Sequence, residues 1–118
     1  MMTRHKYDQA RAHRLVPLLR SITRELRERN AAIETLERTI DQLKTTAERR
    51  GKRANLGELE SELASHRREA RQARQELEKL GCSLDLDHPL RVLIPGSDGQ
   101  LEHGYLWDPA EGTLEAAA

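Results

Sequence analysis

The segment from residue 15 to residue 47 carries apolar side chains that recur three and four positions apart. They are Leu15, Leu19, Ile22, Leu26, Ile33, Leu36, Ile40, Leu43 and Ala47. A helix of 3.6 residues per turn gathers these side chains on one narrow stripe, and alternating spacings of three and four are typical of a coiled-coil seam. Only Arg29 interrupts the series.

A second seam follows. Its members are Leu56, Leu59, Leu63, His66, Ala70, Ala73, Leu77 and Leu80. Two such helices joined by a short polar connection predict an antiparallel hairpin. The fold class is therefore mostly α: a long antiparallel coiled-coil hairpin, followed by a small C-terminal β-hairpin unit.

Composition agrees with one elongated domain. The 118 residues include no Phe and one Trp, and 34% are charged, which is typical of long solvated helices. The formal net charge of zero gives no reason to expect nucleic acid or an anionic membrane as partner. A lone cysteine and the lack of an apolar run of about 20 residues predict a cytoplasmic protein without a membrane segment.

The first helix is expected over residues 8–48. Asp8 is its predicted N-cap, because its carboxylate can accept from the free amides of the first turn. Pro17 lacks an amide hydrogen, so a kink or a break is expected near it. Residues 1–7 are expected to be a loose lead-in.

A basic turn is expected over residues 49–55, with Asn55 as the cap of the next helix. That helix is expected over residues 56–80. Gly81 suits the left-handed conformation in which many helices end.

Antiparallel pairing with a turn near residue 52 sets which flank charges meet. Lys44 is expected to face Glu60, and Glu37 is expected to face Arg67, so both pairs are attractive. The pattern therefore predicts one register for the hairpin.

Two polar residues fall on the seam. Arg29 is expected to lie between Glu25 and Glu76 and to fix the register at some cost in stability. His66 is expected to tune register or partner choice rather than to bind a ligand.

After Gly81 the period changes to two. Alternation over residues 83–87, an apolar run over 90–94 and a return over 100–107 predict a small β unit within residues 83–108. Residues 109–118 are expected to form a tail.

A lone β-hairpin is marginal in water, so the β unit is expected to pack on the open base of the helical hairpin. Val16, Leu18, Tyr105 and Trp107 are expected to supply the apolar contact.

Several short strings together resemble a known family. They are Tyr7-Asp8, Leu15-Val16-Pro17-Leu18-Leu19-Arg20, Leu80-Gly81, Asp85-Leu86-Asp87, Leu90, Pro95, Asp98-Gly99 and Tyr105-Leu106-Trp107 with Glu111. The chain resembles the small bacterial proteins catalogued as domain of unknown function 2203, in which Gly is usual where this chain has Pro89. The resemblance implies the same fold and assigns no activity.

Four cations cluster at the far end of the hairpin: Arg49, Arg50, Lys52 and Arg53. Clustered cations can contact RNA phosphates, which would make the chain an RNA- or ribosome-associated protein. Alternatively they complement the dipole at a helix C-terminus and are merely solvated. No aromatic residue stands among them to stack on a base.

The β unit holds a weak candidate metal set: Asp85, Asp87, His88 and His103. Carboxylates and imidazoles can bind a divalent metal and activate water, which would suit a metal-dependent enzyme. The alternative is that they form turns and keep a sheet edge soluble. No metal-binding motif and no catalytic motif is recognised, and no cofactor is expected.

The leading functional interpretation is a non-enzymatic interaction or scaffold module with an unknown protein partner. Ala32, Thr39 and Thr46 leave one flank of the first helix small and neutral, so a second hairpin can pack there. We therefore expect a homodimer that forms a four-helix bundle. Cys82 is expected to be a small buried side chain.

Overall fold

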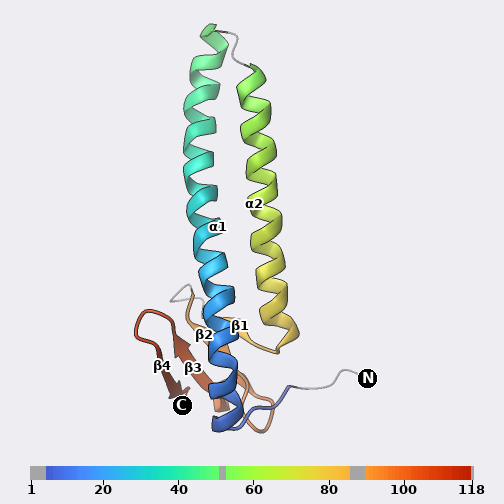
Figure 1. Ribbon diagram of the computed structural model, residues 1–118, viewed down its shortest axis with the longest axis vertical. Helices are drawn as coiled ribbons and strands as arrows, with labels where there is room; N and C mark the ends of the chain where they lie inside the picture. The colour runs from blue at the N-terminus through green and yellow to red at the C-terminus, as the bar shows by residue number, and fades with distance from the viewer. Residues whose placement is uncertain (1–4, 51–52, 86–89, 118) are drawn as a thin grey trace.

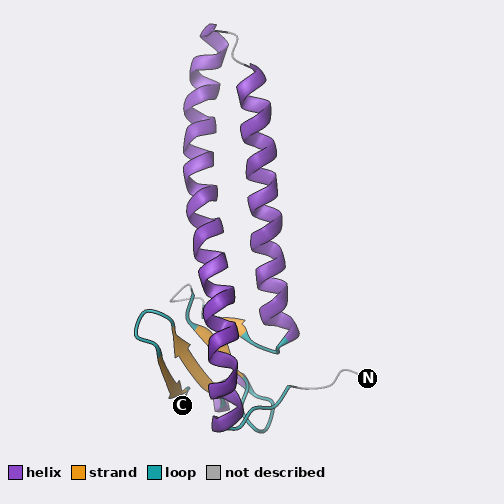
Figure 2. Cartoon of the chain, in the orientation of Figure 1, coloured by secondary structure: helices purple, strands orange, loops and turns teal. Residues whose placement is uncertain are grey.

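The computed structural model describes residues 5–50, 53–85 and 90–117, and side chains within 5–45, 55–85 and 90–117. The described elements are the helices α1 (Gln9–Arg50) and α2 (Arg53–Lys79), the strands β1 (Ser83–Leu84), β2 (Val92–Ile94), β3 (Tyr105–Asp108) and β4 (Thr113–Ala116), and a short 3-10 helix (Leu101–His103). The two helices run side by side in opposite directions, and the small sheet lies at their base (Figure 1). Figure 2 separates the helical arm from the strands. The predicted fold class is confirmed.

The start of α1 follows the predicted capping. The Asp8 carboxylate accepts a hydrogen bond from the Arg11 amide at 2.8 Å. The helix then continues without interruption through Pro17, so the predicted alternative of a break is wrong and the kink stays a prediction. Pro17 lacks only the backbone hydrogen bond to the carbonyl of His13. The core-facing residues before and after Pro17 hold the helix together.

The end of α2 is a Schellman motif. Gly81 has φ +78°, the Cys82 amide donates to the Leu77 carbonyl at 3.0 Å and the Gly81 amide donates to the Glu78 carbonyl at 2.9 Å. The predicted terminal glycine is therefore confirmed. Asn55 lies inside α2 rather than before it, because the helix begins two residues earlier at Arg53, so its predicted capping role is wrong.

The seam residues line the contact between the helices. Buried ones are Leu19, Ile22, Leu26, Leu36, Ile40, Leu63, Ala70, Ala73 and Leu77, and half-buried ones are Leu15, Ile33, Leu43, Leu56, Leu59 and Leu80. On the flanks, Lys44 Nζ lies 3.8 Å from Glu60 Oε1. Arg67 Nη2 lies 3.0 Å from Glu37 Oε1. Both predicted ion pairs are confirmed, and with them the register.

The sheet is an antiparallel meander in the order β1-β2-β3-β4. Val92, Ile94 and Trp107 have no exposed surface. Val92 is paired with Trp107, so these alternating side chains share the inward face. β1 covers Ser83–Leu84 and Asp85 is not part of it, whereas residues 86 and 87 of the predicted strand over 83–87 lie outside the described residues.

The tail predicted for residues 109–118 is wrong, because Thr113–Ala116 is the fourth strand. Asp108 accepts a hydrogen bond from the Ala110 amide at 2.9 Å and so turns the chain. Leu114 then pairs with Trp107 and packs against the core. Formation of β4 therefore buries part of the Leu114 side chain beside Trp107.

The base of the hairpin and the sheet share one core. Val16 and Tyr105 pack against it at its edge and Trp107 lies within it, as predicted. Leu18 is 45% exposed, so its predicted contact with the sheet is wrong. The next residue, Leu19, takes the inward position about 100° around the helix.

Tyr7 is held by specific contacts, so the loose lead-in predicted for residues 1–7 is wrong at this residue. Its side chain is buried, and its hydroxyl donates to the Leu80 carbonyl at 2.8 Å. Its amide donates to the Gly96 carbonyl at 3.2 Å. The residue therefore joins the end of α2 to the loop after β2.

Candidate functional site

A groove of about 320 Å³ runs between the two helices near the base of the arm. Leu18, Ser21, Ile22, Arg24, Glu25 and Glu28 line it from α1, and Glu69, Gln72, Ala73 and Glu76 line it from α2. Ile22 and Ala73 are buried and form its apolar part. Leu18 is the exposed large hydrophobic side chain among the described residues, and it lies at this groove.

Negative charge dominates the groove. Four of its lining residues are glutamates, and one is an arginine. Negative charge also raises the pKa of the nearby Arg29 guanidinium. The hydrogen bond to Glu25 is the largest cause, and the charges of Glu25, Glu69 and Glu28 raise the pKa further. The groove therefore favours a cation.

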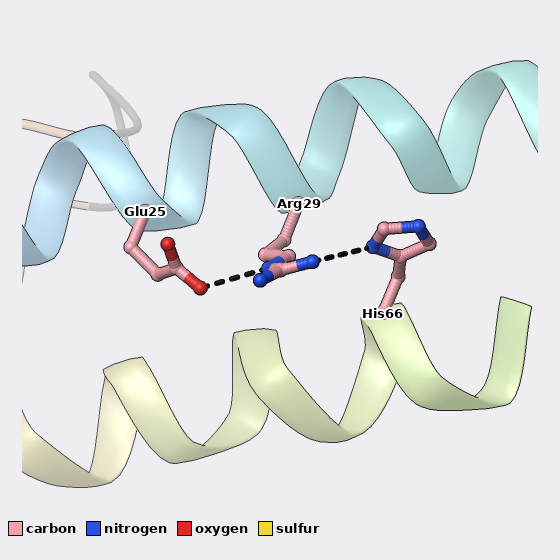
Figure 3. A network of polar contacts seen from close by, with 3 residues as sticks. All are labelled: Glu25, Arg29 and His66. Carbon is pink, nitrogen blue, oxygen red and sulfur yellow. Dashed lines mark hydrogen bonds and ion pairs between the residues drawn. The ribbon is translucent and has the colours of Figure 1, made fainter. Parts of the chain in front are cut away.

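A chain of three polar residues crosses from one helix to the other beside the groove (Figure 3). Arg29 Nε donates to Glu25 Oε1 at 2.8 Å. Its Nη1 lies 3.0 Å from His66 Nδ1. Because arginine can only donate, Nδ1 accepts and the imidazole carries its proton on Nε2, which lies 3.9 Å from Glu62 Oε1.

This arrangement corrects the predicted bridge from Glu25 to Glu76. Arg29 reaches His66 on the opposite helix instead of a second carboxylate. The Nδ1 atom of His66 is an uncharged hydrogen-bond acceptor for the Arg29 guanidinium. The two polar residues that interrupt the seam thus satisfy each other.

The predicted nucleic-acid set cannot be placed in full. Arg49 and Arg50 end the helix α1, and Arg53 begins α2. The side chains of all three, and Lys52 as a whole, lie outside the described residues. Binding of RNA at this tip stays a prediction from the sequence.

The candidate metal set is only partly described, because Asp87 and His88 lie outside the described residues. His103 Nδ1 lies 2.6 Å from Asp98 Oδ2, and Asp98 also accepts from the Gln100 amide at 2.9 Å. The role of His103 in the described region is thus to pair with Asp98 in an exposed turn. Within the described ranges, no three His, Cys, Asp or Glu side chains are grouped so that they could hold a metal ion.

Cys82 follows the glycine that ends α2. The residue is buried, and burial raises the pKa of its thiol to about 12. A protonated, buried thiol is a poor nucleophile. Cys82 is therefore a small side chain of the core.

A protein-family model described as an uncharacterised conserved protein, DUF2203, matches residues 5–110. The chain belongs to this family. The match includes Tyr7, both helices and the sheet as far as β3, so it covers the groove as well. No curated protein and no solved structure matches the chain. Neither helix, over its described residues, is long and apolar enough to cross a membrane.

Sequence reasoning missed the groove. Leu18 was assigned to the contact with the sheet, and no role was assigned to Glu28 or Glu69. The available signal was that Leu18, Ser21, Glu25 and Glu28 succeed one another at spacings of three and four on one side of α1. That spacing marks a second, partly apolar stripe beside the seam.

Proposed function

We propose that this DUF2203 protein is a non-enzymatic interaction module whose groove binds a cationic, amphipathic segment of another protein. The observation that carries the proposal is Leu18, left 45% exposed beside four glutamates. An apolar contact within a charged rim is how many protein interfaces are built.

The groove suits a helical partner segment. Its apolar surface is narrow, with Ile22 and Ala73 between the helices and Leu18 beside them. One apolar side chain of the partner can contact Leu18 while arginines or lysines one turn away meet Glu28 and Glu69. Such helix-in-groove binding uses anchors three and four residues apart. Complementary charge makes the association of the two partners faster and more selective.

Self-association is a second part of the proposal. On the small, neutral flank of α1, Ala32 and Thr39 are both half-buried, and the side chain of Thr46 lies outside the described residues. A second hairpin packing on this flank would form the four-helix bundle expected from the sequence. Sedimentation equilibrium at micromolar concentration tests it: a dimer supports it, and a stable monomer contradicts it.

The groove is tested with a defined probe, a synthetic helical peptide that carries leucine and arginine at spacings of three and four. Chemical-shift changes in the intact protein should map to Leu18, Ser21 and Gln72. The double variant Leu18→Lys, Glu28→Lys should lose the binding. Glu34→Lys, a charge change at an exposed position of α1 outside the groove, is the matched control.

Two results would overturn the groove proposal. One is equal affinity for a peptide in which glutamate replaces arginine, because the charge of the groove would then not matter. The other is unchanged binding by the double variant. The rival RNA function is separated by repeating a native pull-down with nuclease, since partners that need RNA are then lost.

A further inference from the structure

Three arginines of α1 border a smaller hollow beside the acidic groove, and one of them, Arg24, lines both. Arg20, Arg24 and Arg27 line the hollow together with Thr23 and with Pro109 from the turn between β3 and β4. Its volume is about 200 Å³. The arginines are spaced four and three residues apart, which places them on one side of the helix.

Within the described part of the chain, no carboxylate forms an ion pair with any of these three arginines. Arg24 also lines the acidic groove, where Glu25 and Glu28 lie, but Glu25 is bound to Arg29. Three adjacent guanidinium groups repel one another, and a bound anion would relieve that repulsion.

Thr23 and the turn between β3 and β4 form the rest of the lining of the hollow. Thr23 is 1% exposed, and its hydroxyl donates to the Leu19 carbonyl at 2.9 Å, so it stays oriented toward its own helix. On the opposite side, Arg20 Nη2 lies 4.0 Å from where a Cβ on Gly112 would stand. The turn that contains Pro109 and Gly112 therefore forms a second wall against the arginines.

We propose that Arg20, Arg24 and Arg27, with the β3–β4 turn as the opposite wall, bind a phosphate group, either free or as a monoester on a small molecule. Guanidinium forks match phosphate oxygens in pairs. The hollow is smaller than the roughly 300–1,000 Å³ typical of drug-sized ligands, so it takes the phosphate rather than a whole nucleotide. The site shares Arg24 with the groove between the helices, whereas Arg20 and Arg27 line the hollow and not the groove.

The test is a titration of the intact protein with inorganic phosphate, followed by NMR of the arginine Nε–Hε groups. Chloride at the same ionic strength is the control for screening. Saturable shifts are expected at Arg20, Arg24 and Arg27. Arg24→Gln should weaken phosphate binding about tenfold, the usual effect of losing one charged hydrogen bond. Arg68→Gln, at an exposed position of α2, should leave the binding unchanged.

O-phosphoserine, titrated in parallel, separates the two sources of phosphate: tighter binding than inorganic phosphate assigns a monoester, and equal or weaker binding assigns the free ion. Shifts that do not saturate, or that chloride reproduces, overturn the site. Unchanged affinity in Arg24→Gln overturns it as well, with circular dichroism showing that the variant is folded. Binding of an oligoribonucleotide through these arginines, without binding of phosphate, also overturns it.

Discussion

Arg29 on α1 donates a hydrogen bond to His66 Nδ1 on α2 across 3.0 Å. The contact joins the two helices at the one place where both seams carry a polar residue. It requires the imidazole to be an acceptor at Nδ1, because guanidinium has no lone pair to offer. The two residues form a matched pair, and a change in either should affect the other.

We expect His66→Gln and His66→Lys to differ. Glutamine keeps an acceptor oxygen for Arg29, whereas lysine brings a second cation against the guanidinium. Thermal unfolding should therefore show a clearly lower Tm for His66→Lys than for His66→Gln. Lysine at the neighbouring exposed position 65 (Ser65→Lys) is the control for added charge. Equal Tm values for the two His66 variants would show that the contact does not contribute.

Truncation of the neighbours Leu18 and Leu19 should lower the free energy of unfolding to very different extents. Leu19 has no exposed surface and Leu18 is 45% exposed. Leu19→Ala should lower the free energy of unfolding by about 2–5 kcal/mol, and Leu18→Ala should change it by about 0.5 kcal/mol or less. Urea denaturation measures both. A loss for Leu18→Ala as large as that for Leu19→Ala would mean that Leu18 is a core residue and not a binding residue.

The parts of the fold that depend on local period were predictable. The seams follow from spacings of three and four, and the turn position then fixes the register that brings Lys44 to Glu60 and Glu37 to Arg67. Pairing by register needs only the helical rise and the location of the turn.

Contacts between distant segments were not predictable in this way. The bond from the Tyr7 hydroxyl to the Leu80 carbonyl links residues 73 positions apart, and no periodicity reports it. β4 was missed because Leu114 is its one large apolar residue, and the strand depends on Trp107 as its neighbour. Arg29 had several partners within reach, and the sequence does not show which rotamer the opposite helix favours.

The pair of Asp98 and His103 should give a pH-dependent contribution to folding. The hydrogen bond between them raises the pKa of His103 above its usual 6.5 and lowers the pKa of Asp98 below its usual 3.8. Folding therefore favours the imidazolium and the carboxylate together. The stabilisation is present between these usual values and is lost as pH rises through the folded-state pKa of His103 or falls through that of Asp98.

An NMR titration of His103 measures this effect. In Asp98→Asn the pKa of His103 should fall back toward its usual value, because its main hydrogen-bond acceptor has lost its charge. Glu102→Gln should lower it less, since Glu102 acts only through its charge at a distance. A His103 titration that is the same in Asp98→Asn and in the unchanged protein would contradict the pairing.

The Cys82 thiol should be unreactive in the folded protein. Its pKa of about 12 leaves almost no thiolate at pH 8, and its burial excludes a reagent until the structure opens. A colorimetric disulfide reagent should modify it slowly in buffer and rapidly in denaturant. Equal rates in the two conditions would show that the end of α2 opens readily or that the thiol is exposed.

The most direct test of the interaction function compares what three forms of the intact protein retain from nuclease-treated native lysate. The forms are the unchanged chain, the groove variant Leu18→Lys, Glu28→Lys, and the control Glu34→Lys, with retained proteins measured by quantitative mass spectrometry. We predict that the unchanged chain and the Glu34→Lys control retain one or a few proteins with a cationic segment, and that the groove variant does not retain them. Retention of the same proteins by the groove variant would contradict this prediction.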